Sequence, residues 1–476
     1  MQQRGIYIDG QWHAGTSALP DINPSDTDDV IAQFACASAA QMRDAVSAAR
    51  RAQPAWEAAT TQFRADILGR TAAEMMARKE ELGEIVSREA GKTRAEGMGE
   101  VVRAAQIFGF FAGETVRYRG ENLPSVRPNI DVQISREAVG VVTLITPWNF
   151  PIAIVAWKLA PALAFGNTVV LKPSEHTPAI ACELMEILSR HGLPAGVANL
   201  VNGDGATASV ALLQDVDAVS FTGSVATGEK IAQKAITRMI PMQLEMGGKN
   251  PLVVLDDADL AVAVECAANG AFFSAGQRCT ASSRLIVTEG IHDRFIVALR
   301  ERLRALRVGP ALDENVDIGP IINASQLDRS LRYIDIGKGE GATLYEGGTR
   351  VQARTPGFFL RPTLFTDTHN AMRINQEEIF GPVASVIRVK DYEEALSVAN
   401  DTAFGLSSGI CTASLKYATH FRRHVRSGLT MVNLPTAGLD YHVPFGGMKG
   451  SSYGPREQGT FAVEFYTTTK TAYLGY

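Results

Sequence analysis

One cysteine stands in a sequence setting that suits nucleophilic chemistry. Cys279 follows the small-residue turn Ala275-Gly276 and precedes the apolar run Leu285-Ile286-Val287. A thiol on a short turn can be partly exposed while its backbone stays in place, and a thiolate is a strong nucleophile. Most free cysteines are buried apolar residues, so the pattern by itself leaves a structural role for Cys279 open.

Two other side chains have the right type to assist such a nucleophile. Asn149 follows the apolar run 141–145 in a turn bounded by two prolines, where its amide N–H can stabilise an oxyanion. Turn capping is the commoner role of an Asn. Glu245 lies between apolar neighbours and before two glycines. Partial burial would tune this carboxylate as a general base, whereas an exposed Glu is the usual alternative.

Two further stretches have features of nucleotide binding. Lys172 and Glu175 follow the run 168–171, where they can hydrogen-bond a ribose, while Thr177 and the proline after it indicate a helix start. Gly223 and Ser224 follow another strand-like run and open a helix, whose N-terminal N–H groups suit a phosphate. The glycine spacing is not Gly-x-Gly-x-x-Gly, so as a general signal it is weak.

The elements that must position these residues alternate between strand and helix. Residues 1–36 are turn-rich, 38–119 have a helical pattern, and 130–134 alternate as in an exposed or edge strand. From 139 to 235 strands alternate with helices, among them helices at 179–190 and 206–213. The second half repeats this style. We therefore expect an α/β protein with parallel sheets, whose ligands bind at the carboxyl ends of strands.

Composition limits the classes of function. The chain has 476 residues, enough for two or three domains, and a formal net charge of −5, which argues against nucleic-acid or anionic-membrane partners. No leader-like or membrane-length apolar run is present in the sequence. The five cysteines are far apart, which indicates neither disulfides nor a metal site and fits a reducing cytoplasm.

Taken together and in this order, the motifs resemble the aldehyde dehydrogenase superfamily over nearly the whole chain. The stretches that carry the resemblance are 146–151, 172–178, 221–224, 244–251, 276–280, 378–382 and 444–447. The resemblance implies that Cys279 is the nucleophile and that Glu245 activates the hydrolytic water. It implies that Asn149 and the backbone N–H of Cys279 bind the oxyanion. Acylating relatives typically lack the Glu, so its presence favours release of a free acid.

The resemblance also implies a nicotinamide cofactor and its contacts. Lys172 and Glu175 match the adenosine-ribose contacts, Ser224 a pyrophosphate contact, and Glu378 the nicotinamide-ribose contact, with Phe380 packed beside it. The remaining residues expected at the cofactor are Trp148, Gly223 and Met246. A carboxylate at position 175 favours NAD over NADP, because it would repel a 2′-phosphate. Lys172 and His176 act in the opposite direction, so NADP remains an alternative.

In family architecture, an atypical dinucleotide-binding sheet is joined to a catalytic domain and a small β arm. The resemblance implies a coenzyme domain at 1–119 and 138–247, a catalytic domain at 248–445, and an oligomerisation arm at 120–137 and 458–476. We expect the run from Phe461 to Leu474 to be a strand that pairs with another subunit, giving a homodimer or homotetramer.

The aldehyde is indicated by a narrower resemblance. Stretches 433–447 and 451–459, in which Pro455 interrupts the usual Tyr-Gly-Arg-Glu, are similar to family members that oxidise 2,5-dioxopentanoate. Its carboxylate would need a cation; Arg278 is one candidate, although a structural hydrogen bond is its more common role. Tyr441 and His442 are possible hydrogen-bonding partners. Succinate semialdehyde, another aliphatic aldehyde, or a non-catalytic member of the same fold are the alternatives.

Overall fold

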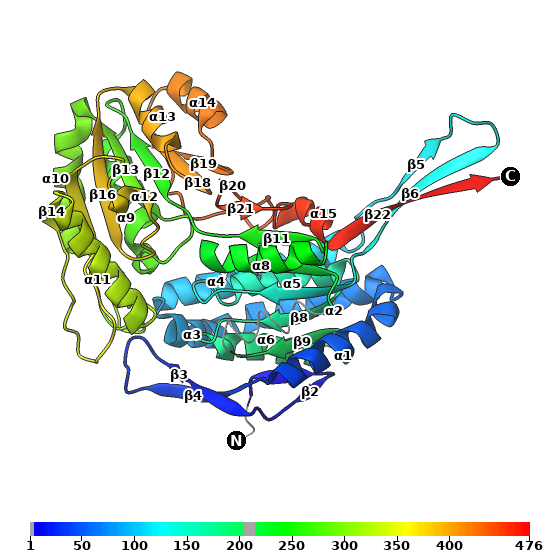
Figure 1. Ribbon diagram of the computed structural model, residues 1–476. Helices are drawn as coiled ribbons and strands as arrows, with labels where there is room; N and C mark the ends of the chain where they lie inside the picture. Colours follow the sequence, from blue (N-terminus) through cyan, green and yellow to red (C-terminus); the bar gives the residue numbers. More distant parts are fainter. Residues whose placement is uncertain (1–3, 204–214) are drawn as a thin grey trace.

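The computed structural model describes residues 4–203 and 215–476, which form an α/β fold around two large β-sheets and a projecting arm (Figure 1). The parallel α/β organisation expected from the sequence is confirmed. The helix expected at residues 206–213 lies outside the described residues. Within the described ranges, no helix combines the length and the apolar character needed to cross a membrane.

The first sheet has the strand order β2-β1-β9-β8-β7-β10-β11-β21, and its five strands from β9 to β11 are parallel. Parallel neighbours bring their carboxyl ends to one edge. The strands are β1 (Ile6–Ile8), β2 (Gln11–Trp12), β7 (Val141–Ile145), β8 (Thr168–Lys172), β9 (Ala198–Val201), β10 (Ala218–Thr222), β11 (Met242–Glu245) and β21 (Ser452–Tyr453).

Helices cover this sheet and bury its apolar side chains (Figure 1). Helix α4 begins with a capping box, in which Thr93 and Glu96 each satisfy a backbone N–H of the other. Helix α6 starts at Pro178 as predicted, but Thr177 makes no capping bond, and Glu89 accepts the N–H groups of Ala179 and Ile180 instead. The helices are α1 (Ala39–Glu57), α2 (Thr61–Ala77), α3 (Lys79–Ala90), α4 (Arg94–Glu114), α5 (Ala153–Ala164), α6 (Pro178–Arg190) and α8 (Val225–Thr237).

The second sheet has the order β14-β15-β16-β13-β12-β18-β19 and is parallel except for β14. Its strands are β12 (Asn250–Val254), β13 (Ser282–Thr288), β14 (Thr343–Glu346), β15 (Thr363–Thr368), β16 (Val383–Val389), β18 (Ser407–Cys411) and β19 (Leu429–Val432). The helices of this half are α9 (Leu260–Phe272), α10 (Glu289–Ala305), α11 (Ala324–Gly339), α12 (Arg373–Gln376), α13 (Tyr392–Asn400) and α14 (Leu415–His424). Two short ladders, β3 (Ser17–Ile22) with β4 (Val30–Cys36) and β17 (Phe404–Gly405) with β20 (Met448–Lys449), complete the described strands outside the arm.

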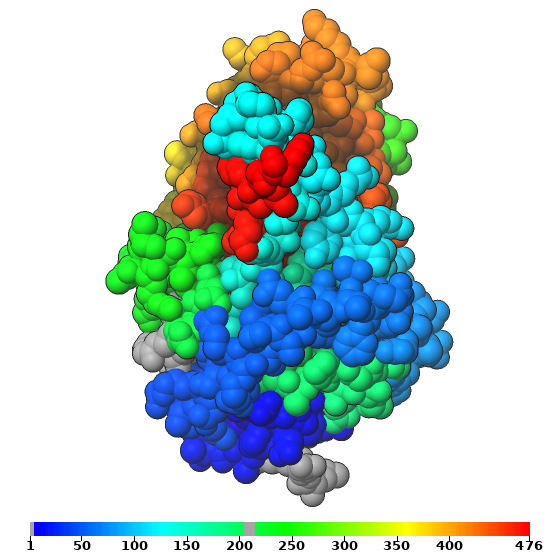
Figure 2. Space-filling model, turned by 90° about the vertical axis from the view of Figure 1, so that its right-hand side faces the viewer, coloured from blue at the N-terminus to red at the C-terminus, as the bar shows by residue number. Residues whose placement is uncertain are grey.

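The arm is a three-stranded antiparallel sheet in the order β22-β6-β5. It comprises β5 (Glu121–Pro124), β6 (Ile130–Ala138) and β22 (Thr467–Gly475), and it extends away from both large sheets (Figure 1). Viewed along the arm, β22 and the β5–β6 hairpin lie on the face toward the viewer (Figure 2). An exposed or edge strand was expected at 130–134. These residues do form part of a strand in which exposed and half-buried residues alternate, but β6 is not at an edge, because it is paired on both sides.

The predicted start of the C-terminal strand was also wrong. Residues 459–462 form a 3₁₀ turn and α15 (Val463–Tyr466) follows, so the strand begins only at Thr467. Ala462, Phe465 and Tyr466 are all buried in the core beneath the first sheet. Their spacing of three and four residues places them on one helical face, and this contact decides the local structure.

Candidate active site

The predicted site residues lie where the sheets end and the two halves of the chain meet. Asn149 follows β7, Lys172 closes β8, Ser224 follows β10, and Glu245 closes β11. These four strands are parallel neighbours, so the residues after them lie at one edge of the first sheet. Cys279 reaches this edge from the other half, just before β13.

A tight backbone turn holds Cys279. Ser274 and Ala275 adopt left-handed φ angles of 54° and 53°, and Gly276 has φ 65°. A Cβ at Gly276 would lie 2.2 Å from the carbonyl oxygen of Gly381, so a glycine is required there. Beyond the turn, Asn250 Nδ2 donates to the carbonyl oxygen of Cys279 at 2.7 Å. The backbone at Cys279 is therefore held on both sides.

Asn149 is close to the same turn. Its side chain is buried, and Nδ2 donates to the carbonyl oxygen of Gln277 at 3.1 Å. An amide nitrogen carries two hydrogens, and this bond uses one of them. The second hydrogen can therefore serve a negative oxygen at the nucleophile.

The Cys279 thiol is protonated at neutral pH in the free protein. Burial raises the pKa of Cys279 to about 12, and the carboxyl groups of Glu378 and Glu245 add to this increase. The backbone N–H groups of Thr280 and Cys279 act in the opposite direction. Nucleophilic attack from this site therefore needs a proton acceptor or an added positive charge.

Glu245 is buried and hydrogen-bonded. In the β11–β21 ladder it lies opposite Ser452, whose Oγ donates to Glu245 Oε2 at 2.5 Å. Burial, followed by the charge of Glu457, raises the pKa of the Glu245 carboxyl well above its usual range. The hydrogen bond from Ser452 lowers this pKa, and the charges of Lys158 and Arg456 act in the same direction. A carboxyl with a raised pKa near a thiol has the properties of a general base.

Behind Glu245 lies a buried ion pair that the sequence analysis missed. Lys158 donates to Glu457, and it also donates to Ser220 Oγ at 2.7 Å. A signal was present, because Lys158 is the one charged residue in the otherwise apolar helix α5. A lysine in such a helix needs a buried partner.

The predicted cofactor contacts form two groups. In the first, Lys172 Nζ lies 3.0 Å from Glu175, and Ser224 caps helix α8. Burial is the largest single influence and opposes ionisation of Glu175, but the charge of Lys172 and the hydrogen bonds to the carboxylate together outweigh it, and the pKa of Glu175 is lowered. A Cβ at Gly223 would lie 2.6 Å from the Phe221 ring.

In the second group, Glu378 accepts the N–H of Gly248 at 2.9 Å, and burial raises the pKa of this carboxyl. Phe380 packs edge-on against Trp148 with ring centroids 5.4 Å apart. Met246 lies against Gly228 of α8, where a Cβ would come within 2.5 Å of its sulfur. Together these groups offer a helix N-terminus, two carboxylates and an aromatic wall, which suits a dinucleotide.

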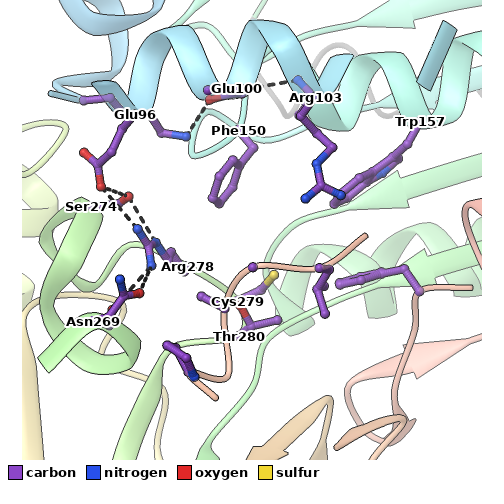
Figure 3. Close-up of a pocket in the computed structure, with 18 of the residues that line it drawn as sticks. Glu96, Glu100, Arg103, Phe150, Trp157, Asn269, Ser274, Arg278, Cys279 and Thr280 are labelled. Atoms are coloured by element: carbon purple, nitrogen blue, oxygen red, sulfur yellow. Dashed lines mark hydrogen bonds and ion pairs between the residues drawn. The ribbon is translucent and has the colours of Figure 1, made fainter. Parts of the chain in front are cut away.

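Cys279 opens into a cavity of about 480 Å³. Figure 3 shows Glu100 and Arg103 of α4 on one side of it, and Cys279 and Thr280 on the other. Apolar walls come from α5, the turn before it and the loop before β20, and the residues that supply them include Phe150, Ala153, Trp157, Pro435, Ala437, Leu439 and Phe445. Tyr441 and His442 are not among the lining residues; Tyr441 packs edge-on against Phe110.

The cavity lining carries three cationic side chains, Lys92, Arg103 and Arg278, and two carboxylates, Glu96 and Glu100. Lys92 lies 2.5 Å from Glu100, and Arg278 lies 3.2 Å from Glu96. Arg278 also donates to Ser274 at 3.1 Å and Asn269 at 3.3 Å, so its bonds are structural. With all five groups ionised, the lining has one net positive charge.

The two parallel sheets, the strand-end carboxylate and the cysteine on its constrained turn form a candidate active site of the kind found in α/β enzymes, whose ligands bind at the carboxyl ends of strands. The family model of the aldehyde dehydrogenase family matches residues 12–472, and this chain belongs to that family.

Individual relatives differ in their aldehyde. The α-ketoglutaric semialdehyde dehydrogenase of Bacillus subtilis is 42% identical over 474 residues, covering 98% of this chain and 97% of that protein. The betaine aldehyde dehydrogenase of the same organism is 38% identical, covering 98% and 96%. The crystal structure of betaine aldehyde dehydrogenase from Staphylococcus aureus in complex with NAD+ has a TM-score of 0.97 at 34% identity, covering 100% of this chain and 95% of that one.

Proposed function

We propose that this aldehyde dehydrogenase oxidises its substrate to a free carboxylic acid through a covalent intermediate on Cys279. The observation that carries the proposal is the thiol at the cavity, with the Asn149 amide beside its turn and the Glu245 carboxyl close enough to shift its pKa. The Cys279 thiol first loses its proton, which is the proton released in the net reaction. The sulfur then bonds to the aldehyde carbon and gives a thiohemiacetal, whose oxyanion is stabilised by Asn149 Nδ2 and the N–H of Cys279.

The later steps follow from the same residues. Bound NAD would accept the hydride from the substrate carbon, with Glu378 and Ser224 among the residues that hold it. The thiohemiacetal then becomes a thioester on Cys279. Glu245 takes a proton from water, the water oxygen bonds to the acyl carbon, and the carbon–sulfur bond breaks to return the thiol. Aldehyde, water and NAD+ are thus converted to acid, NADH and a proton.

Two substitutions test this sequence of steps. Cys279→Ser should abolish NADH formation while NAD binding is retained, because the cavity keeps its other groups. Glu245→Gln should give at most one NADH per active site, followed by a stalled thioester detectable by mass spectrometry of the intact protein. Steady turnover at the wild-type rate in either variant would overturn the assigned role.

For the substrate we propose 2,5-dioxopentanoate, with succinate semialdehyde next. Support comes from the net positive charge of the cavity lining and from the α-ketoglutaric semialdehyde dehydrogenase relative. A monoanionic aldehyde balances that charge, whereas betaine aldehyde is a cation and would be repelled. The test is kcat/KM for 2,5-dioxopentanoate, succinate semialdehyde, uncharged pentanal and betaine aldehyde. A higher kcat/KM for pentanal would refute the assignment of an anionic substrate. The absence of NADH formation with every aldehyde would favour a non-catalytic protein.

For the cofactor we propose NAD in preference to NADP. Glu175 favours its ionised form, and a carboxylate accepts hydrogen bonds from ribose hydroxyls but repels a 2′-phosphate. Two groups nearby could attract a 2′-phosphate. Lys172 is already paired with Glu175 at 3.0 Å, and His176 lies 3.2 Å from Asn323 and has its pKa lowered by burial, which favours the uncharged imidazole. Comparing kcat/KM for the two cofactors tests this, and a clear NADP preference would contradict it.

We further propose a homodimer or homotetramer assembled through the arm, with the domain limits expected from the sequence. Strand β22 is at the edge of its sheet, and Leu123, Tyr473 and Leu474 on the arm are exposed. An open edge with apolar side chains favours pairing with a second chain. Light scattering at micromolar concentration tests this, and a monomer would refute it.

A further inference from the structure

One face of helix α4 supplies three charged groups to the cavity. Glu96, Glu100 and Arg103 are spaced by four and three residues, which places them on the same side of a helix. All three line the cavity, and the Arg103 side chain extends from α4 into the space on the side opposite Cys279 (Figure 3).

The other two cations of the cavity are held by bonds to the protein. Lys92 is paired with Glu100 and lies 3.4 Å from the centre of the Phe150 ring. Arg278 is paired with Glu96 and bonded to neighbours on its own turn. Neither can reach a ligand without giving up its carboxylate partner, and this is costly because both ion pairs are largely removed from solvent.

Arg103 differs from both. Across residues 4–203 and 215–476, no carboxylate lies within 4.0 Å of its guanidinium, and no hydrogen bond to its side chain is found. The side chain is only partly exposed, and Asp440 interacts with it at longer range. A guanidinium keeps its charge at neutral pH and presents a planar fork of N–H donors that matches a carboxylate. The guanidinium of Arg103 faces the cavity that Cys279 also lines.

We infer that Arg103 binds the carboxylate at the far end of the substrate and thereby selects anionic over cationic aldehydes. This inference rests on the proposed function and assigns the residue that carries its charge preference. The aldehyde carbon is held at Cys279 while the carboxylate meets Arg103 across the cavity. The apolar walls between them accommodate the carbon chain. Arg278, the cation expected from the sequence, acts instead as a support of the nucleophile's turn.

The test compares Arg103→Met with Arg103→Lys and with Arg94→Met, an exposed arginine on the same helix outside the cavity. The substrates are 2,5-dioxopentanoate, pentanal and betaine aldehyde. Arg103→Met should lower kcat/KM for 2,5-dioxopentanoate by about 10- to 150-fold, mainly through KM, because it removes hydrogen bonds to a charged group. The value for pentanal should stay within about threefold, and that for betaine aldehyde should rise as a repulsive charge is removed.

The two controls make the outcome specific. Arg103→Lys should recover part of the activity with 2,5-dioxopentanoate, since it restores the charge without the fork, and Arg94→Met should match wild type. Equal losses with all substrates in Arg103→Met would assign a structural role and overturn the inference. An unchanged preference for the anion in that variant would also overturn it. If wild type itself shows no preference for the anion over pentanal, the proposed substrate fails, which is a separate result.

Discussion

Ser452→Ala should shift the pH dependence of thioester hydrolysis to higher pH. Ser452 Oγ donates to Glu245 Oε2 at 2.5 Å, and this bond stabilises the ionised carboxylate, so it lowers the pKa of Glu245. A hydrogen bond to a charged group contributes about 1.5–3 kcal/mol. Since about 1.4 kcal/mol corresponds to one pKa unit, its loss should raise the pKa of Glu245 by about 1–2 units.

The assay separates hydrolysis from the steps before it. Hydrolysis needs ionised Glu245, so its rate rises with pH through this pKa, and the rising limb should move up by about 1–2 pH units in Ser452→Ala. Stopped-flow NADH formation in a single turnover reports hydride transfer, and saturating kcat from pH 6 to 10 reports the full cycle.

The matched control is Ser452→Thr, which keeps a hydroxyl and should retain the wild-type profile. An unshifted profile in Ser452→Ala would refute the role of this hydrogen bond. A shift to lower pH would refute the sign of the argument, because removing a donor to a carboxylate can only weaken its ionised form.

Three further predictions concern the thiol, the buried ion pair and the arm. Alkylation of Cys279 in cofactor-free protein should still accelerate at pH 10, because its pKa is about 12; a plateau near pH 9 would contradict this. Lys158→Met should lower the thermal midpoint of unfolding, since an unpaired buried charge costs about 3–5 kcal/mol. Adding Glu457→Gln to this variant should restore most of the lost stability. A double variant as unstable as Lys158→Met alone would exclude a charge effect. Removing residues 467–476 should reduce the mass in light scattering without changing the circular dichroism of the two large sheets, and an unchanged mass would place the interface elsewhere.

The sequence alone determined the features that depend on local pattern. Alternating strand and helix signals predicted parallel sheets, and polar residues directly after apolar runs predicted which strand ends carry the site. The turn before Cys279 could be predicted because it depends on a run of small residues next to each other in the sequence. Parallel strands bring their carboxyl ends together whatever the details of packing, so Asn149, Lys172, Ser224 and Glu245 lie at one edge as the strand pattern implied.

Other features depended on contacts between distant parts of the chain. Ser452 lies 207 positions from Glu245, and Lys158 lies 299 positions from Glu457, so no local pattern connects these partners. The helical turn at 463–466 forms because its apolar residues enter the core, which overrides the strand-like composition around it. Strand β6 is central rather than at the edge because the distant β22 covers it.

The cationic residues of the cavity show most clearly the difference between what the sequence predicts and what tertiary contacts decide. Sequence position next to the nucleophile suggested Arg278, yet its donors are taken by Glu96 and by its own turn. Arg103 is far from Cys279 in sequence and reaches the cavity only because α4 packs over it. The sequence gives the type of each side chain. Whether a cationic side chain is already paired depends on which carboxylates lie within reach of it, and only the tertiary structure determines this.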